Sequence, residues 1–257
     1  MKKSHLIDPN NSTLRIIRSK SGSDIPKLIS RIPLREISSV LDVGCDIGEN
    51  TKLLVGLIPA AQIRGIDKSQ ERIAYATETF KLDNLIFSCK DFELDLIEGK
   101  YDLVCFFTVM HWFKDIFFAL ERTKEVLNKN GFVAIVSVTK GLLREAIEEI
   151  RASCKWKEFF VNYKPQKNHV SRDELIKLAE DLGLATVYSN TLTQKVAFND
   201  KISACYSMAK WLEGLERIPL ENREEFLLEI VEAYLAKSGR KEVCLEFPSF
   251  ELILNNK

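Results

Sequence analysis

The part of the sequence that most constrains the fold is the stretch Ser39–Asp67. It opens with a short apolar run over residues 40–43, typical of a buried strand, which leads into a turn containing two glycines. Apolar residues at helical spacing over 49–57 predict a helix, and a second strand is predicted over 62–66. Strand, glycine turn, helix, strand and a closing acid are together typical of a nucleotide-binding βαβ unit.

The turn and the closing acid suit different parts of a nucleotide. Glycine allows the backbone to approach a ligand closely, and the first turn of a helix offers unpaired N–H groups. The carboxylate of Asp67 can accept hydrogen bonds from both ribose hydroxyls. The dinucleotide fingerprint G-x-G-x-x-G is not met, because the order here is Asp42-x-Gly44-x-Asp46-x-Gly48. An ordinary strand-to-helix turn of a doubly wound fold is the alternative, and the position of Asp67 argues against it.

The rest of the chain continues the alternation of strands and helices. Further strands are predicted over 85–90, 102–108, 132–138, 186–198 and 243–254, and helices over 69–80, 114–127, 200–215 and 219–237, with 141–184 largely helical. Asn130-Gly131 is expected to end the helix over 114–127, and Pro248 is expected at a bulge or at the edge of the sheet. This order predicts an open α/β sheet with right-handed crossovers, whose ligand crevice lies at the carboxyl ends of the strands.

The residues before the first strand form a basic segment. Its charged side chains are Lys2, Lys3, Arg15, Arg18, Lys20, Lys27, Arg31 and Arg35 against Asp8 and Asp24. Two short helices are predicted here, the first capped by Asn11 or Ser12 and the second by Asp24. A solvated helical face is the more common meaning of such charges. The hypothesis beside it is that these helices lie over the ligand cleft and that Arg15 and Arg18 face an anionic substrate.

The composition argues against several other classes of protein. Lys+Arg and Asp+Glu number 37 each and the pI is about 6.8, which disfavours a large basic nucleic-acid footprint. The first residues do not have the apolar segment of a signal peptide, and the apolar runs are too short to span a membrane. Six scattered cysteines without a C-x-x-C pair indicate free thiols of a cytoplasmic protein rather than a zinc site or a disulfide framework.

The glycine turn resembles the D-x-G-x-G-x-G signature of class I S-adenosylmethionine (SAM) methyltransferases, with Asp46 in place of the middle glycine. Other segments resemble the group that includes trans-aconitate and juvenile hormone acid methyltransferases. They are His111-Trp112 with Lys114-Asp115 and Leu127-x3-Gly131, and, further on, Trp211-Leu212, Ile218-Pro219, the helix Phe226–Tyr234 and Phe247-Pro248. The resemblance covers most of 39–257 and does not extend to the first 38 residues.

The resemblance implies a Rossmann-like class I methyltransferase fold, with a seven-stranded, mostly parallel sheet, one antiparallel strand, helices on both faces and a helical cap. It implies a methyltransferase domain over 39–257 behind an N-terminal arm or lid over 1–38, with 141–184 and 199–237 forming the substrate cap. SAM is the implied cofactor and S-adenosylhomocysteine (SAH) the product. The implied cofactor-binding residues are Asp42, Gly44, Cys45, Asp46, Gly48, Thr51, Asp67, Lys68, Asp91, Phe92 and Thr108.

Two of these residues have an equally simple structural interpretation. By resemblance, Asp91 accepts a hydrogen bond from the adenine amino group and Phe92 packs on the adenine ring. The alternative is an aspartate that caps a turn at the end of a strand, followed by a core phenylalanine. We favour the functional interpretation because these residues occur together with the glycine turn and Asp67.

The resemblance implies transfer of the methyl group to a carboxylate oxygen of a small organic acid by in-line displacement. A carboxylate with a pKa near ~4 is already ionised at neutral pH, so no general base is required. Trp112 is expected to wall the acceptor pocket and to donate from its indole N–H, and His111 is either a second donor or a satisfied core histidine. No metal ion, nucleic acid or membrane partner is expected, and we expect a monomer or weak dimer.

Other functions fit parts of the sequence. A malonyl-carrier-protein methyltransferase also esterifies a carboxylate, and the basic segment would then meet an acidic carrier protein. A nucleic-acid amino-methyltransferase is disfavoured, because Thr108-Val109-Met110-His111 stands where its N/D-P-P-Y/F motif belongs. Asp46 motivates a third alternative, because it brings a side chain and a negative charge towards the methionine end of SAM, where the carboxylate is repelled and the ammonium attracted. Weak or absent SAM binding would leave a non-catalytic binding or regulatory module.

Overall fold

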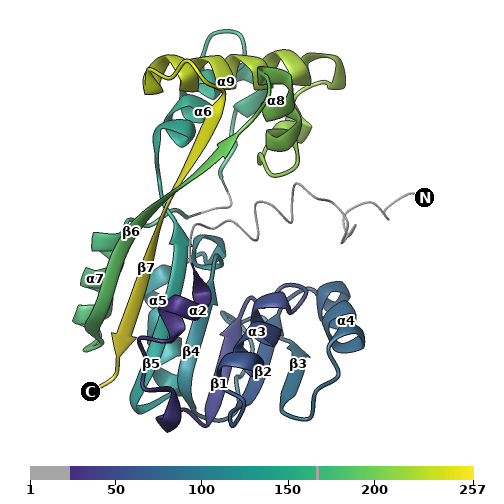
Figure 1. Ribbon diagram of the computed structural model, residues 1–257. Coiled ribbons are helices and arrows are strands. Elements are labelled where there is room, and N and C mark those ends of the chain that lie inside the picture. The colour runs from purple at the N-terminus through teal and green to yellow at the C-terminus, as the bar shows by residue number, and fades with distance from the viewer. Residues whose placement is uncertain (1–23, 166–167) are drawn as a thin grey trace. The chain divides into compact units, whose positions relative to one another are not determined.

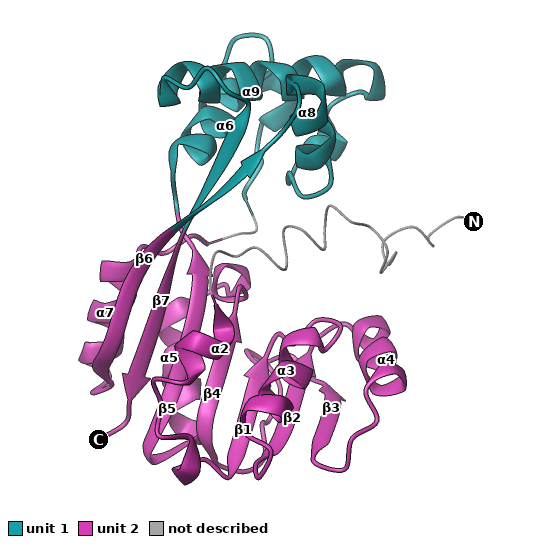
Figure 2. Cartoon of the chain, in the orientation of Figure 1, with its two compact units in different colours: residues 1–22, 140–166, 193–248 teal, residues 23–139, 167–192, 249–257 magenta. Residues whose placement is uncertain are grey.

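The computed structural model describes residues 24–165 and 168–257. The first predicted N-terminal helix, with Arg15 and Arg18, lies outside the described residues. The chain divides into two compact units (Figure 2). The sheet unit is drawn from 23–139, 167–192 and 249–257, and the helical unit from 140–166 and 193–248.

A seven-stranded sheet has the strand order β3-β2-β1-β4-β5-β7-β6 (Figure 1). Its strands are β1 (Ser39–Val43), β2 (Gln62–Asp67), β3 (Leu85–Cys89), β4 (Tyr101–Phe107), β5 (Leu127–Val138), β6 (Ala185–Ala197) and β7 (Cys244–Asn255). Strand β1 pairs in parallel with β2 and β4, β2 with β3, and β4 with β5, whereas β7 runs antiparallel to β5. The predicted seven-stranded, mostly parallel sheet is therefore confirmed.

Most of the described α-helices begin after a residue whose side chain caps the first turn. The α-helices are α2 (Ile25–Ile29), α3 (Glu49–Leu57), α4 (Gln70–Thr79), α5 (Ile116–Val126), α6 (Leu142–Ala152), α7 (Arg172–Asp181), α8 (Lys201–Ala209) and α9 (Arg223–Ser238). Short 3-10 helices are η1 (Leu34–Glu36), η2 (Met110–Trp112), η3 (Lys157–Phe160), η4 (Leu215–Arg217) and η5 (Leu220–Asn222). Asp24 caps α2 by accepting a hydrogen bond from the N–H of Lys27, as predicted. No described helix is long and apolar enough to cross a membrane.

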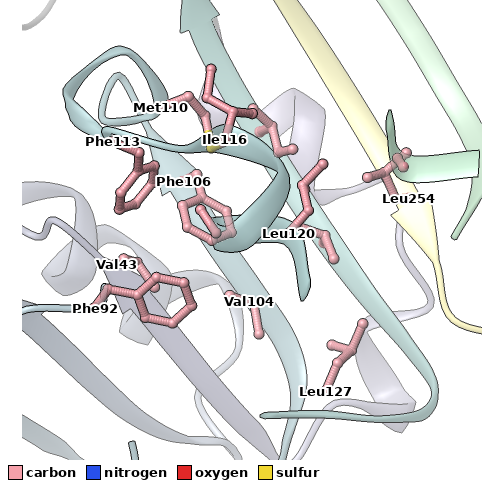
Figure 3. Close-up of a cluster of buried hydrophobic side chains, with 14 of the residues drawn as sticks. Val43, Phe92, Val104, Phe106, Met110, Phe113, Ile116, Leu120, Leu127 and Leu254 are labelled. Atoms are coloured by element: carbon pink, nitrogen blue, oxygen red, sulfur yellow. The ribbon is translucent and has the colours of Figure 1, made fainter. Parts of the chain in front are cut away.

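Strand β4 separates two hydrophobic cores of the sheet unit. Val104 and Phe106 belong to the first core, to which α5 and α7 contribute, and Leu103 and Phe107 belong to the second, to which α2 and α3 contribute. Figure 3 shows the first core, with Val104 and Phe106 beside Leu120 of α5. Alternate residues of β4 are thus buried on opposite faces, as expected for a central parallel strand.

The helical unit has a core of its own, in which α6 and α8 pack against α9. Trp156 is only 1% exposed, and its ring meets that of Phe226 edge-on at a centroid distance of 5.2 Å. The indole Nε1–H of Trp156 donates to Glu229 Oε2 at 2.6 Å. The polar end of this large side chain is therefore satisfied where its apolar body is buried.

Asn130-Gly131 does not end a helix, contrary to the prediction. Helix α5 already ends at Val126, and Asn130 and Gly131 lie inside β5, where the ladder to β4 shifts register. Asn130 has a positive φ of 63°, and its N–H donates to the carbonyl oxygen of Asn256 at 2.6 Å. Asparagine and glycine both adopt left-handed backbone readily, and this conformation occurs at helix ends and at irregular points of strands. The local sequence therefore does not distinguish a helix end from an irregular strand.

Parts of the expected substrate cap (141–184) and of the expected N-terminal arm (1–38) belong to the sheet unit. Within 141–184, α6 ends at Ala152, and α7 belongs to the sheet unit, where Leu175 and Ala179 join the first core. Helix α2 likewise belongs to the sheet unit, and its Leu28 lies in the second core. Periodicity identified these helices, but it carries no information on which core their apolar faces join.

Pro248 does not lie on an outer edge strand. Strand β7 stands between β5 and β6, and Pro248 immediately precedes Ser249, whose pairing with Val138 ends the ladder to β5. A ring on the backbone nitrogen is tolerated here because this ladder has already ended.

Asp102 joins the beginnings of β1 and β4 by a set of hydrogen bonds. Its Oδ2 accepts from the N–H of Ser38 at 2.9 Å, from Ser38 Oγ at 2.7 Å and from the N–H of Ser39 at 3.1 Å, and its Oδ1 accepts from Asn128 Nδ2 at 2.7 Å. Burial alone would raise the pKa of this carboxyl, but these hydrogen bonds outweigh it and lower the pKa to about 2.

Replacing this carboxylate by an amide is expected to give a pH-dependent loss of stability. Asp102→Asn should lower the free energy of unfolding by about 1 kcal/mol near neutral pH, a value reduced because the carboxyl is partly solvated. The folded pKa lies below the unfolded one, so the stabilisation is present above roughly pH 4 and is lost as the pH falls towards 2. Urea unfolding of both proteins across this range tests it, with exposed Asp83→Asn as control. A difference that does not shrink on acidification would contradict the assignment.

Candidate functional site

The turn after β1 is built on three residues with left-handed backbone. Gly44, Asp46 and Gly48 have φ values of 70°, 52° and 83°. A Cβ at Gly44 would lie 2.3 Å from Val109 Cγ2, and a Cβ at Gly48 would lie 2.6 Å from the ring of Phe87. The two glycines are therefore required both by backbone conformation and by space, whereas the middle position accepts an aspartate, which tolerates this conformation better than most residues.

Asp42 in β1 and Thr51 in α3 form a hydrogen bond across this turn. Thr51 Oγ1 donates to Asp42 Oδ2 at 2.7 Å. Thr51 is 0% exposed and Asp42 is 1% exposed. Burial raises the pKa of Asp42 to about 7; the negative charge of Asp67 also raises it, and the bond from Thr51 lowers it. The sequence predicts that both residues bind the cofactor. In the structure both are enclosed, and their hydrogen bond joins β1 to α3.

Asp67 ends β2 with its carboxylate held by two backbone donors. Oδ2 accepts from the N–H of Asp46 at 3.1 Å and Oδ1 from the N–H of Ser69 at 2.9 Å. Asp67 is 8% exposed, and the adjacent Lys68 is exposed. The acid is thus fixed against the turn, and each carboxylate oxygen keeps capacity for a further hydrogen bond.

Cys45 fills space beneath the turn. It is 5% exposed, and burial, followed by the nearby charge of Asp42, raises the pKa of its thiol well above the usual range. The side chain is therefore a neutral, small apolar group. The described cysteines are all free thiols, in agreement with the sequence.

Asp91 and Phe92, the two predicted site residues after β3, lie in different environments. Asp91 Oδ1 accepts from the N–H of Glu93 at 2.9 Å, so this half-buried carboxylate caps a turn. Phe92 is 4% exposed, and its ring packs against Phe106 and Phe113 at centroid distances of 5.7 and 5.9 Å (Figure 3). For Phe92 the core role weighed from the sequence is the one that the structure supports.

Strand β4 is followed directly by a residue with left-handed backbone. Thr108 has a φ of 59°; its N–H donates to the carbonyl oxygen of Val136 at 2.7 Å and its Oγ1 to that of Phe107 at 2.7 Å. The 3-10 helix η2 follows at once and carries the His-Trp pair. A threonine with left-handed backbone at the end of the central strand is strained, a condition often found at functional sites.

His111 and Trp112 differ sharply in exposure. His111 is 8% exposed and stacks on His169 with 5.4 Å between ring centroids and 7° between planes, whereas Trp112 is 42% exposed. The backbone also joins these segments, since the N–H of Asn168 donates to the carbonyl oxygen of His111 at 2.7 Å. Sequence reasoning missed His169, because no motif links it to a histidine so far along the chain.

The structure therefore gathers the predicted residues at one edge of the sheet unit. The glycine turn follows β1, Asp67 ends β2, Asp91 follows β3 and Thr108 follows β4, and these four parallel strands are neighbours (Figure 1). The carboxyl edge of an open parallel sheet is where such folds bind ligands. Within the described ranges, no group of three or more His, Cys, Asp or Glu side chains is arranged to hold a metal ion.

The chain is similar in sequence to known methyltransferases. The family described as methyltransferase domain matches residues 17–189. The chain is 32% identical over 188 residues to malonyl-[acyl-carrier protein] O-methyltransferase of Acetivibrio thermocellus, covering 71% of this chain and 64% of that protein. It is 24% identical over 242 residues to trans-aconitate 2-methyltransferase of Shigella dysenteriae, covering 88% of this chain and 90% of that one.

A solved structure has the same fold at low sequence identity. It is the O-methyltransferase from a trans-AT PKS multienzyme of Brevibacillus brevis in complex with S-adenosyl-L-homocysteine. The TM-score is 0.57 and the identity 11%, with 95% of this chain and 75% of that chain covered.

Proposed function

Because the chain belongs to the family of SAM-dependent methyltransferase domains, we propose that it transfers the methyl group of SAM to a carboxylate oxygen of a small organic acid. The names of two relatives support this acceptor, since malonyl-[acyl-carrier protein] and trans-aconitate both carry free carboxylates.

The chemistry of the carboxylate acceptor matches the titratable groups at the carboxyl edge. An oxygen–carbon bond forms as the carbon–sulfur bond breaks, so that carboxylate and sulfonium become ester and thioether without transfer of a proton. Among the described residues of this edge, Asp42 is the carboxyl whose pKa is raised to near neutrality, and it is enclosed against Thr51. An acceptor that is already ionised does not need a general base. The carboxylates in the names of the two relatives are the observation that carries the proposal.

We assign the residues of the edge as follows. Asp67 binds the ribose hydroxyls, Asp91 accepts from the adenine amino group, and the turn with Gly44 and Gly48 surrounds the methionine part. Trp112, which is half exposed, walls the acceptor pocket. Catalysis then rests on alignment of the two reactants and on exclusion of water.

Transfer of a labelled methyl group tests this function. With radiolabelled SAM and a panel of small mono-, di- and tricarboxylic acids, we expect label to enter a product that mild base hydrolyses, because methyl esters are base-labile. His111→Ala should lower the rate if that ring donates to the acceptor, and an unchanged rate would assign His111 to the core. Label in a base-stable product, or no transfer to any acid, would contradict carboxyl methylation.

A carrier-bound acid is the second candidate, favoured by the 32% identity to a malonyl-[acyl-carrier protein] O-methyltransferase. A protein acceptor held by surface charge would make the rate fall steeply with added salt, whereas a small acid in a pocket would show a weaker dependence. A non-catalytic module remains the contrasting function, and calorimetry with SAM and SAH decides it, since absence of heat at millimolar ligand would exclude the enzyme.

A further inference from the structure

A carboxylate from the loop after β3 completes the cap of α5. Glu93 Oε1 accepts from the N–H of Lys114 at 2.9 Å and from the N–H of Asp115 at 3.3 Å. Asp115 is the N-cap residue, and its own Oδ1 accepts from the N–H of Phe118 at 3.0 Å. In a capping box the position of Phe118 holds a glutamate or glutamine whose side chain returns to the N-cap N–H. Phenylalanine has no acceptor, so Glu93 supplies one from a segment 22 residues earlier in the chain.

The loop that carries Glu93 is folded around Asp91. Asp91 Oδ1 accepts from the N–H of Glu93 at 2.9 Å. The N–H of Asp91 donates to Asp95 Oδ2 at 2.8 Å, and the carbonyl oxygen of Asp91 accepts from the N–H of Asp95 at 2.8 Å. Arg122, near the middle of α5, donates from Nη2 to the carbonyl oxygen of Asp95. The loop is therefore bound to α5 at two points, the start of the helix and its middle.

These contacts form a continuous path between two segments to which we assign different tasks. The carboxylate of Asp91, assigned to the adenine amino group, holds the backbone of Glu93. The carboxylate of Glu93 in turn holds the backbone at the start of α5. Trp112, assigned to the wall of the acceptor pocket, lies in η2, just ahead of that backbone. One glutamate thus joins the loop of the cofactor contact to the segment of the acceptor wall.

We propose that Glu93 is a positioning residue through which binding of the adenosine part of the cofactor orders the segment that walls the acceptor pocket. This inference rests on the proposed function. A ligand bonded to Asp91 restrains the loop, and Glu93 passes that restraint to the first N–H groups of α5, which have no partner within the helix. An ionised acceptor makes a stronger hydrogen bond than a neutral one, so a carboxylate suits this task. The acceptor segment is then most ordered when the cofactor is bound.

Amide hydrogen exchange of the full chain, with and without saturating SAH, tests this path. In the wild type, SAH should slow exchange in residues 44–48 and also in residues 114–118, the latter by about fivefold, the lower end of the usual range for coupling between two sites. Glu93→Ala should keep the slowing in 44–48 and lose it in 114–118, because the turn is still occupied while the link is cut. Glu93→Gln should restore at least about half of the lost effect, since an amide oxygen can accept from the same two N–H groups.

The comparison of the two segments separates the link from damage to the site. Glu98→Ala is the matched control and should behave as the wild type, since Glu98 is an exposed glutamate in the same connection between β3 and β4. Slowing in 114–118 that survives in Glu93→Ala, or that is absent from the wild type while 44–48 is slowed, would overturn the link and leave the SAM site in place. A Glu93→Gln protein that behaves as Glu93→Ala would overturn it too. A wild type in which SAH slows neither segment would overturn the SAM site as well.

Discussion

Asp67→Ala is expected to weaken SAH binding by about 100-fold, the loss that follows when two hydrogen bonds from ribose hydroxyls to one carboxylate are removed. The carboxylate also accepts from the N–H groups of Asp46 and Ser69, so its removal loosens the glycine turn as well. Both effects act in the same direction, which makes this the largest binding effect that we expect from one substitution.

Calorimetry with SAH and circular dichroism of the variant separate binding from folding. Asp67→Asn should retain part of the affinity, because an amide keeps the size of the side chain and one acceptor oxygen. Asp83→Ala is the matched control, since Asp83 is an exposed aspartate ahead of β3. A dissociation constant for Asp67→Ala within about threefold of the wild type would remove this acid from the site.

Trp156→Ala should lower the free energy of unfolding by about 3–5 kcal/mol, the range for truncation of a buried aromatic side chain. Trp156 is 1% exposed in the core of the helical unit, packs edge-on against Phe226 and donates to Glu229. The variant leaves a cavity and removes the donor to Glu229 Oε2, while Glu229 Oε1 still accepts from Lys155 Nζ. Trp156→Phe should lose less, because most of the packing remains.

Urea unfolding followed by circular dichroism gives the total loss, and hydrogen exchange locates it. Exchange should accelerate first in α6 and α9, which pack together in this unit, and later in the β1–β4 ladder. Trp112→Ala provides a matched tryptophan control with an expected loss below about 1 kcal/mol, since that side chain is 42% exposed. Equal losses for the two tryptophan variants would contradict the assigned core.

The βαβ unit was predictable because its signals are local. A buried apolar run, a turn that needs glycine and a helix with apolar residues at helical spacing all lie within Ser39–Asp67, and the structure reproduces their boundaries closely. Caps were equally accessible, since Asp24 and Ser69 act on N–H groups three residues away.

What could not be predicted depends on residues far apart in the chain. Asn130 lies within a strand because its N–H meets Asn256, and nothing near residue 130 reports that partner. Phe92 follows a strand in a position suited to a ligand, yet Phe106 and Phe113 supply a core for its ring. Arg72 is one of many charged helical residues, and only the fold places it beside Asp46.

The pairing of β5 with the late residues 249–255 also has a consequence for synthesis on the ribosome. Those residues emerge only after the whole helical unit has been translated, because 140–166 and 193–248 precede them. Until then β5 has β4 on one side and does not yet have its antiparallel neighbour on the other. A nascent chain is therefore exposed to strand-to-strand association at β5 throughout that interval, and a chaperone acting during translation would protect the yield of the protein more than one acting afterwards.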